Sequence, residues 1–141
     1  MDLELAGKVA IIGGGSKGLG RACAEVLAQE GAKLTLCSRT AADLHQAAEE
    51  IRGETNADIL EFPGDLDDPE TITALVAATV ERFGRLDIMV NNSGGPPLAR
   101  AATATEEQWA TAVQRSLLFF ARMSQASLPH LRKQGAGRII N

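Results

Sequence analysis

The residues best suited to chemistry lie at positions 9–20, VAIIGGGSKGLG, where a short apolar run leads into a glycine-dense turn and then a helical pattern. Glycine lets the backbone adopt positive φ angles and approach a ligand closely, and a helix that follows points free N–H groups at an anion. Two glycine patterns fit the turn: GxGxxG at Gly13, Gly15 and Gly18, and GxxxGxG at Gly14, Gly18 and Gly20. We therefore predict a phosphate-binding turn; the alternative is a tight strand-to-helix turn without a ligand.

The end of the second expected strand indicates which nucleotide the turn would hold. An NAD site normally has an acid there, which binds the ribose 2′-hydroxyl, whereas this chain has Ser38 and Arg39. A guanidinium at this place would pair with a 2′-phosphate, and Lys17 in the glycine turn would add a second positive charge. The pattern favours NADP(H) over NAD(H) and disfavours an S-adenosylmethionine-dependent methyltransferase; the alternative is that both cations are solvated surface charges.

Groups that could transfer a proton are scarce. The sequence contains no tyrosine, and its two histidines, His45 and His130, lie on expected helices away from the ends of the strands. We interpret both histidines as surface or packing residues. Cys23 and Cys37 lack metal-ligand or redox spacing, so we predict that both are small core residues and that the chain has no metal site.

Apolar runs of strand length alternate with stretches of helical period, which is the pattern of a parallel sheet with crossover helices. We expect strands at residues 9–12, 33–37, 59–62, 87–91 and 138–141. Short right-handed connections predict an α/β fold, a Rossmann-type doubly wound parallel sheet of order 3-2-1-4-5 that is truncated in its fifth strand at Asn141. Ligands bind beyond the carboxyl ends of strands one and four in such a sheet, and these ends carry GGGSKGLG and NNSGG.

The expected helices have apolar faces and local start signals. The first helix is expected to bury one face, formed by Leu19, Ala22, Cys23, Val26 and Leu27. Thr40 and Asp43 resemble a capping box for the second helix, and Asp68 with Pro69 supplies an N-cap and a first-turn proline for the third. A long helix is expected over residues 106–134, with an apolar side formed by Trp109, Val113, Leu117, Phe120, Met123 and Leu131.

Composition and charge narrow the class of protein. With 141 residues, 45% of them hydrophobic, and a pI near 5.2, residues 1–141 are expected to form a single dinucleotide-binding domain. The net charge of −4, with acids and bases interleaved, disfavours nucleic acid or an anionic membrane as a partner. The N-terminus has no signal-peptide pattern and no apolar run approaches the roughly 20 residues of a membrane span, which favours a cytoplasmic location.

Four segments occur in an order and spacing that resemble a known family: VAIIGGGSKGLG, GDLDD, DIMVNNSGG and GRIIN. Together they resemble the N-terminal portion of the classical short-chain dehydrogenase/reductase family, in particular its 3-oxoacyl carrier-protein reductase-like branch, over nearly the whole chain. The resemblance implies that residues 16–19 hold a pyrophosphate, that Asp65 and Leu66 meet the adenine, and that the segment after strand four lines the ribose. The expected cofactor-binding residues are Gly14, Ser16, Lys17, Gly18, Leu19, Gly20, Ser38, Arg39, Asp65, Leu66, Asn91, Ser93 and Gly94.

The resemblance also implies an activity, NADP(H)-dependent hydride transfer between a carbonyl and an alcohol on a small-molecule substrate. The family usually has Thr where Gly13 stands and Ala where Ser93 stands. The family has an Asn in the helix after strand four, seven residues beyond a common Trp. Counting from Trp109 gives Ser116, which is therefore the one candidate catalytic residue. The family's catalytic Ser and its YxxxK motif should lie beyond Asn141, so the chain is expected to lack the C-terminal catalytic and substrate-binding segment and to be inactive alone.

A function of a different class is the alternative: a non-catalytic NADP(H)-binding or assembly protein, that is, a truncated pseudoenzyme. In that case the apolar side of the long helix, notably Phe119, Phe120 and Met123, is expected to be uncovered. Exposed apolar surface of this kind favours binding to a second protein chain. The expected assembly is a homo-oligomer.

Overall fold

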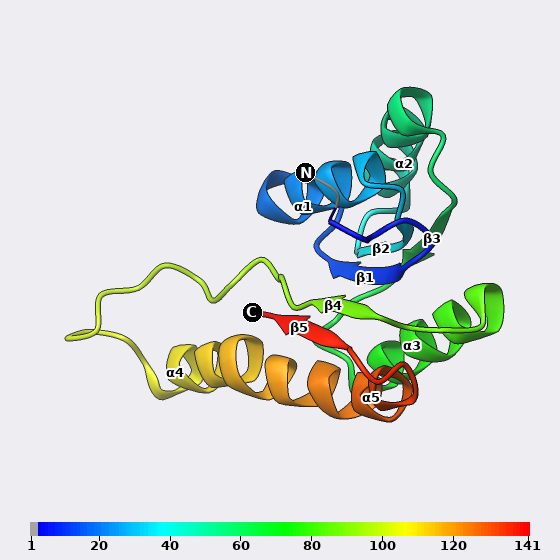
Figure 1. Cartoon of the computed structure of the whole chain (residues 1–141). Helices are drawn as coiled ribbons and strands as arrows, with labels where there is room; N and C mark the ends of the chain where they lie inside the picture. Colours follow the sequence, from blue (N-terminus) through cyan, green and yellow to red (C-terminus); the bar gives the residue numbers. More distant parts are fainter. Residues whose placement is uncertain (1–2) are drawn as a thin grey trace.

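The computed structural model describes residues 3–141 and has at its centre a five-stranded sheet whose neighbouring strands are all parallel (Figure 1). Along the chain the strands are β1 (Val9–Gly13), β2 (Lys33–Ser38), β3 (Ile59–Pro63), β4 (Ile88–Val90) and β5 (Arg138–Ile140). Their order across the sheet is β3-β2-β1-β4-β5. The predicted fold class and strand order are confirmed, and the order reverses between β1 and β4, where ligands bind in such sheets.

Helices cover both faces of this sheet (Figure 1). On one face lie α1 (Gly18–Gln29) and α2 (Ala41–Thr55); on the other lie α3 (Pro69–Phe83) and α5 (Phe119–Lys133), which is preceded by α4 (Glu106–Val113) and the π-helical turn η1 (Gln114–Leu118). Because side chains alternate along a strand, β1 contributes to both cores: Ala10 and Ile12 pack with α1 and α2, and Ile11 packs with α3 and α5. Across residues 3–141, none of the helices has the length and apolar character that a bilayer-spanning segment needs.

The predicted N-terminal cap is present in α3 and absent from α2. Asp68 caps α3 through its side chain and is followed by Pro69 in the first turn, as predicted. The predicted capping box of α2 is wrong, because the Thr40 side chain accepts no capping hydrogen bond. The carboxylate of Asp43 instead forms an ion pair with Lys17 of the glycine turn.

The buried face of α1 differs from the predicted one. Leu19 and Val26 are exposed and Leu27 is half-buried against the core, and the fully buried residues are small: Gly20, Ala24 and Ala28. The helix lies so close to the turn that a Cβ atom on Gly20 would be 2.4 Å from the carbonyl oxygen of Gly14. Cys23 lies outside this buried set and is exposed, so its prediction as a core residue is wrong, whereas Cys37 is buried as predicted.

The predicted long helix is present but is interrupted by η1. A π-helical turn holds more residues than an α-helical turn, so the residues before and after it do not share one face. Trp109 and Leu117 are consequently exposed, whereas Phe119 and Met123 are buried in the core with α3, and Phe120 is half-buried. The expectation that Phe119 and Met123 would be uncovered is therefore wrong.

At the amino ends of the strands, Asp87 joins β1 to β4. Its carboxylate accepts a hydrogen bond from the Val9 backbone N–H at 2.9 Å and two from the Arg85 guanidinium at 2.8 and 2.6 Å. Burial opposes ionisation of Asp87, but the hydrogen bonds from Arg85 and Val9 outweigh it, so the pKa of the carboxyl lies below its usual value. This contact fixes β1 beside β4, the two strands whose opposite ends carry the candidate site.

Candidate nucleotide-binding site

The turn between β1 and α1 places backbone atoms, not side chains, at the carboxyl edge of the sheet. Gly14 and Gly18 have φ angles of +60° and +56°, a conformation that other residues rarely adopt. A Cβ atom on Gly13 would lie 2.4 Å from the backbone oxygen of Asn92. The Asn92 side-chain amide donates a hydrogen bond to the Gly13 carbonyl oxygen at 3.0 Å, so the loop after β4 holds the glycine turn in place.

The N-terminus of α1 has the features of an anion site. Its N-cap residue is Lys17, whose side chain makes no capping hydrogen bond, and its first turn contains no acid. The first N–H groups of an α-helix have no partner within the helix, and the helix dipole adds positive potential at the same end. This end of α1 can therefore hold a phosphate group.

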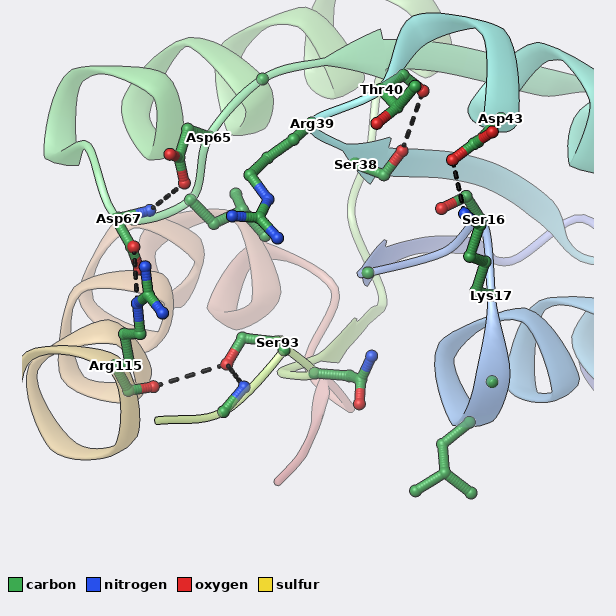
Figure 2. A pocket seen from close by; sticks show the side chains of 18 residues that line it. Ser16, Lys17, Ser38, Arg39, Thr40, Asp43, Asp65, Asp67, Ser93 and Arg115 are labelled. Atoms are coloured by element: carbon green, nitrogen blue, oxygen red, sulfur yellow. Dashed lines mark hydrogen bonds and ion pairs between the residues drawn. The ribbon is translucent and has the colours of Figure 1, made fainter. Parts of the chain in front are cut away.

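A pocket of about 520 Å³ lies at this edge of the sheet, bounded by the glycine turn and by the segments that follow β2, β3 and β4 (Figure 2). Its volume is within the range of about 300–1,000 Å³ that is typical of small-molecule sites. Most of the predicted cofactor-binding residues line it: Gly14, Ser16, Lys17, Gly18, Leu19, Ser38, Arg39, Asp65, Leu66, Ser93 and Gly94. Residues from four separate parts of the sequence thus meet around one cavity, as the topology predicts.

Three predicted site residues do not line this pocket: Gly20, Asn91 and Ser116. Gly20 is buried behind the turn. Asn91 is also buried; its Nδ2 donates to Asn141 Oδ1 at 2.8 Å, and its own Oδ1 has no hydrogen-bond partner within residues 3–141. Ser116 is exposed on η1, so its position gives a catalytic role no support.

The pocket also has lining residues that the sequence did not identify as cofactor-binding: Thr40, Asp43, Gly64, Asp67, Asn92, Gly95 and Arg115. Arg115 Nε donates to Asp67 Oδ2 at 2.8 Å across 48 sequence positions, and the Ser93 hydroxyl donates to the Arg115 carbonyl oxygen at 3.4 Å. No local pattern connects residues so far apart. Asn92 is different, because it lies within NNSGG and its place directly after a strand could have identified it.

The two cations expected at the ribose, Lys17 and Arg39, differ in whether a carboxylate pairs with them (Figure 2). Lys17 Nζ lies 2.6 Å from Asp43 Oδ2. Arg39 is exposed at the pocket and has no ion-pair partner within the described residues. The Ser38 hydroxyl, next to it, donates to the Thr40 carbonyl oxygen at 3.4 Å. Arg39 is therefore the cation that is free to meet an incoming phosphate.

Cys37 precedes the pocket residue Ser38 on β2, but its thiol is not suited to catalysis. Burial, assisted by the negative charge of Asp65, raises the pKa of its thiol to about 12. Its sulfur lies 3.7 Å from the carbonyl oxygen of Gly64, to which the thiol donates. A thiol that stays protonated at neutral pH is a poor nucleophile, so Cys37 acts as a packing residue.

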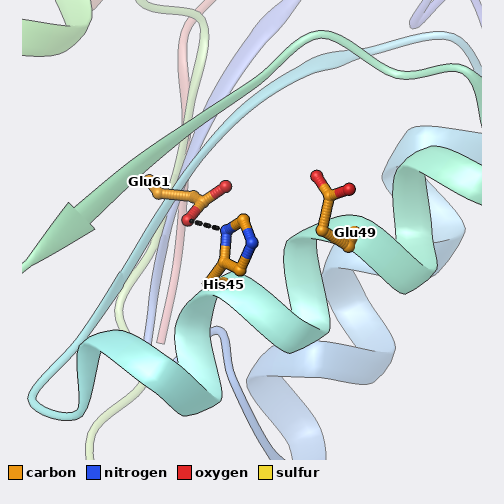
Figure 3. A group of neighbouring side chains, drawn as sticks. All are labelled: His45, Glu49 and Glu61. Atoms are coloured by element: carbon orange, nitrogen blue, oxygen red, sulfur yellow. Dashed lines mark hydrogen bonds and ion pairs between the residues drawn. The ribbon is translucent and has the colours of Figure 1, made fainter.

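His45 lies on the outer surface of α2, away from the pocket, and shares a cluster with Glu49 and Glu61 (Figure 3). His45 Nδ1 is 3.1 Å from Glu61 Oε2. Arg52 Nη1 donates to Glu49 and to Glu61 at 2.6 Å each, so the two carboxylates already share a cation. His45 is thus the surface residue that the sequence predicts, and His130 is half-buried on α5.

Comparisons with known proteins agree with this geometry. A family model described as short chain dehydrogenase matches residues 8–141. The chain is 38% identical to the 1,6-dihydroxycyclohexa-2,4-diene-1-carboxylate dehydrogenase of Pseudomonas putida, covering 100% of this chain and 52% of that protein. It is 34% identical to the 3-oxoacyl-[acyl-carrier-protein] reductase of Vibrio cholerae, covering 99% of this chain and 55% of that protein.

A solved structure gives the same result in three dimensions. L-Sorbose reductase from Gluconobacter frateurii, complexed with NADPH and L-sorbose, superposes with a TM-score of 0.93 at 34% identity. The match covers 99% of this chain and 53% of that one. The chain thus spans about half the length of the curated relatives it matches.

Proposed function

Because the chain belongs to the short chain dehydrogenase family, we propose that its residues form an NADP(H)-binding domain that serves hydride transfer between a carbonyl and an alcohol of a small molecule. The observation that carries the proposal is the combination of an α1 N-terminus without an acid and an exposed Arg39 on one pocket. The first feature suits a pyrophosphate, and the second suits a 2′-phosphate. NADPH is also the nucleotide bound to the similar L-sorbose reductase.

The rest of the pocket fits the remaining parts of the nucleotide. Leu66 is buried and contributes an apolar wall beside Asp65, which suits an adenine ring with its polar edge. The glycine turn leaves room for close approach, since Gly14 and Gly18 have no side chain to meet the phosphates. We assign Ser93 and Gly94, after β4, to the second ribose, because they line the same pocket.

The proposed contribution of these residues to the reaction is to bind and orient the nucleotide. Reduction of a carbonyl also needs a proton donor, and general acid catalysis is typically worth about 10²- to 10⁴-fold. The sequence contains no tyrosine, the Cys37 thiol has a raised pKa and Ser116 lies outside the pocket. We therefore assign the proton donor to none of the 141 residues and assign no catalytic role to Ser116.

Substitution of Arg39 tests the choice of nucleotide. We expect Arg39→Gln to weaken NADPH binding by about tenfold, because a charge-assisted pair with the 2′-phosphate is lost, and to leave NADH binding within about twofold. The matched control is Arg82→Gln, since Arg82 is an exposed arginine that pairs with Asp58 outside the pocket. Equal weakening of NADPH and NADH by Arg39→Gln would contradict the assignment of Arg39 to the 2′-phosphate.

One observation favours a second role, assembly into a homo-oligomer. Trp109, Val113 and Leu117 are 53%, 46% and 62% exposed along α4 and η1, and exposed apolar groups at this spacing are typical of protein interfaces. Sedimentation of the purified chain tests this role. Self-association that is lost in a Leu117→Asp variant would support it, and a monomer at all concentrations would overturn it.

A further inference from the structure

The ion pair between Lys17 and Asp43 lies at the place where nucleotide choice is made (Figure 2). Lys17 comes from the glycine turn and Asp43 from the first turn of α2, and both side chains line the pocket together with Arg39. The distance between Lys17 Nζ and Asp43 Oδ2 is 2.6 Å. A carboxylate is therefore present in the part of the pocket that holds the two cations suited to a 2′-phosphate.

Asp43 stands in the first turn of α2, where a carboxylate also interacts favourably with the helix dipole. It does not take part in a capping box, because the N-cap residue Thr40 makes no side-chain capping bond. Its carboxylate is only partly exposed, at 36%, whereas the Lys17 side chain is 75% exposed. The lysine is thus held toward the α2 side of the pocket by a group that is itself fixed on a helix.

We propose that Asp43 is a specificity-determining residue that reduces the preference of this pocket for NADP(H) over NAD(H). This inference rests on the proposed function of the pocket. Asp43 acts in two ways: it engages the Lys17 ammonium, and its own negative charge opposes a 2′-phosphate. Neither effect applies to NAD(H), which has a hydroxyl at that position, and a carboxylate can accept a hydrogen bond from that hydroxyl.

The sign of the effect follows from the charges. A phosphate monoester carries close to two negative charges at neutral pH, so a nearby carboxylate repels it and a nearby ammonium attracts it. With Asp43 present, the Lys17 charge is largely compensated at short range and Arg39 alone remains unpaired. Removing the Asp43 charge leaves two uncompensated cations for the 2′-phosphate and takes an acceptor away from the ribose of NAD(H).

The test is the Asp43→Asn variant of the full chain, titrated separately with NADPH and NADH by following the fluorescence of the reduced nicotinamide. We expect NADPH affinity to rise by about fivefold, which is the upper range for a partly exposed charge pair, and NADH affinity to stay equal or fall by about twofold. The control is Glu50→Gln, which removes the same charge from α2 at a residue that pairs with Arg21 outside the pocket. The control should leave the ratio of the two affinities unchanged.

A second background separates the two ways in which Asp43 acts. In a Lys17→Gln chain, Asp43→Asn should raise the NADPH-to-NADH affinity ratio by less than in the unsubstituted chain, because the two residues are coupled. An Asp43→Asn ratio that is unchanged or lower, while the unsubstituted chain binds NADPH, would overturn the inference and leave the proposed function intact. Failure of the unsubstituted chain to bind either nucleotide would overturn the proposed function, and the inference with it.

Discussion

The glycine turn between β1 and α1 and the helical segment from α4 to η1 are built in opposite ways. At the turn, backbone atoms pack so closely that a Cβ on Gly20 would lie 2.4 Å from a carbonyl oxygen. Along α4 and η1, large apolar side chains such as Leu117, 62% exposed, point to solvent. The pocket beside the glycine turn is thus enclosed by residues of the described chain, whereas the apolar face of α4 and η1 is not covered by them.

The largest expected effect tests where the core ends along α5 and η1. Met123→Ala should lower the free energy of unfolding by about 2–5 kcal/mol, because Met123 is fully buried and its loss leaves a cavity. Leu117→Ala, six residues earlier, should change it by no more than about 0.5 kcal/mol, because that side chain is largely exposed. Denaturant unfolding at low protein concentration measures both. Equal losses in the two variants would show that Leu117 is covered after all.

A second pair of variants tests the close packing of the turn. Gly20→Ala should destabilise the fold by about 1–3 kcal/mol, because the atom nearest to the new methyl group is the backbone oxygen of Gly14, which cannot move aside easily. Gly53→Ala is the matched control: Gly53 also lies in a helix, α2, and a Cβ there meets nothing within 4 Å. The control should stabilise the protein by up to about 1 kcal/mol through helix propensity.

The same pair also separates stability from binding. Gly20→Ala displaces the turn that faces the pocket, so it should weaken NADPH binding as well, whereas Gly53→Ala should not. A Gly20→Ala protein as stable as the unsubstituted chain would contradict the close contact between α1 and the turn.

The smallest expected effect concerns Asp87, which joins β1 to β4 at the far ends of the strands. Its pKa is lowered in the folded state, so the stability that it contributes is fully present above its unfolded pKa of about 3.9 and is lost as pH falls through the lower, folded value. Asp87→Asn should cost about 1.5 kcal/mol at pH 7, the value typical of a hydrogen bond to a charged group, and should flatten the fall in stability below about pH 4.

Urea unfolding of Asp87→Asn between pH 7 and pH 3 measures this effect. Glu107→Gln is the control. Glu107 is exposed on α4, so this substitution removes the same charge at a place away from the sheet. A stability profile of Asp87→Asn that runs parallel to that of the unsubstituted chain would contradict a role for the Asp87 charge in holding the two strands together.

Sequence patterns predicted the sheet well because its order depends on connection lengths and on apolar runs that are local. They also identified Gly14 and Gly18, which line the pocket, since the positive φ angles at these positions favour glycine. The face of α1 was predicted wrongly because small residues, Ala24 and Ala28, are the ones that fit against the sheet. Apolar periodicity follows large side chains and cannot detect that kind of packing.

The parts of the pocket that could not be predicted depend on contacts between distant residues. Asp67 and Arg115 meet across 48 positions, and Lys17 meets Asp43 instead of standing free. The interruption of the long helix by η1 could not be predicted either, because nothing in the segment QRSLL excludes a regular α-helix. The NADP(H) assignment therefore depends on which cations remain unpaired in the folded chain, and charge at a sequence position alone does not decide that.

Calorimetric titration of the 141-residue chain with NADPH tests the central claim most directly, because it measures binding without requiring turnover. The pocket predicts saturable binding with one nucleotide per chain and weaker binding of NADH under the same conditions. Absence of saturable NADPH binding to a chain that unfolds cooperatively would contradict the claim that these residues form a complete nucleotide site.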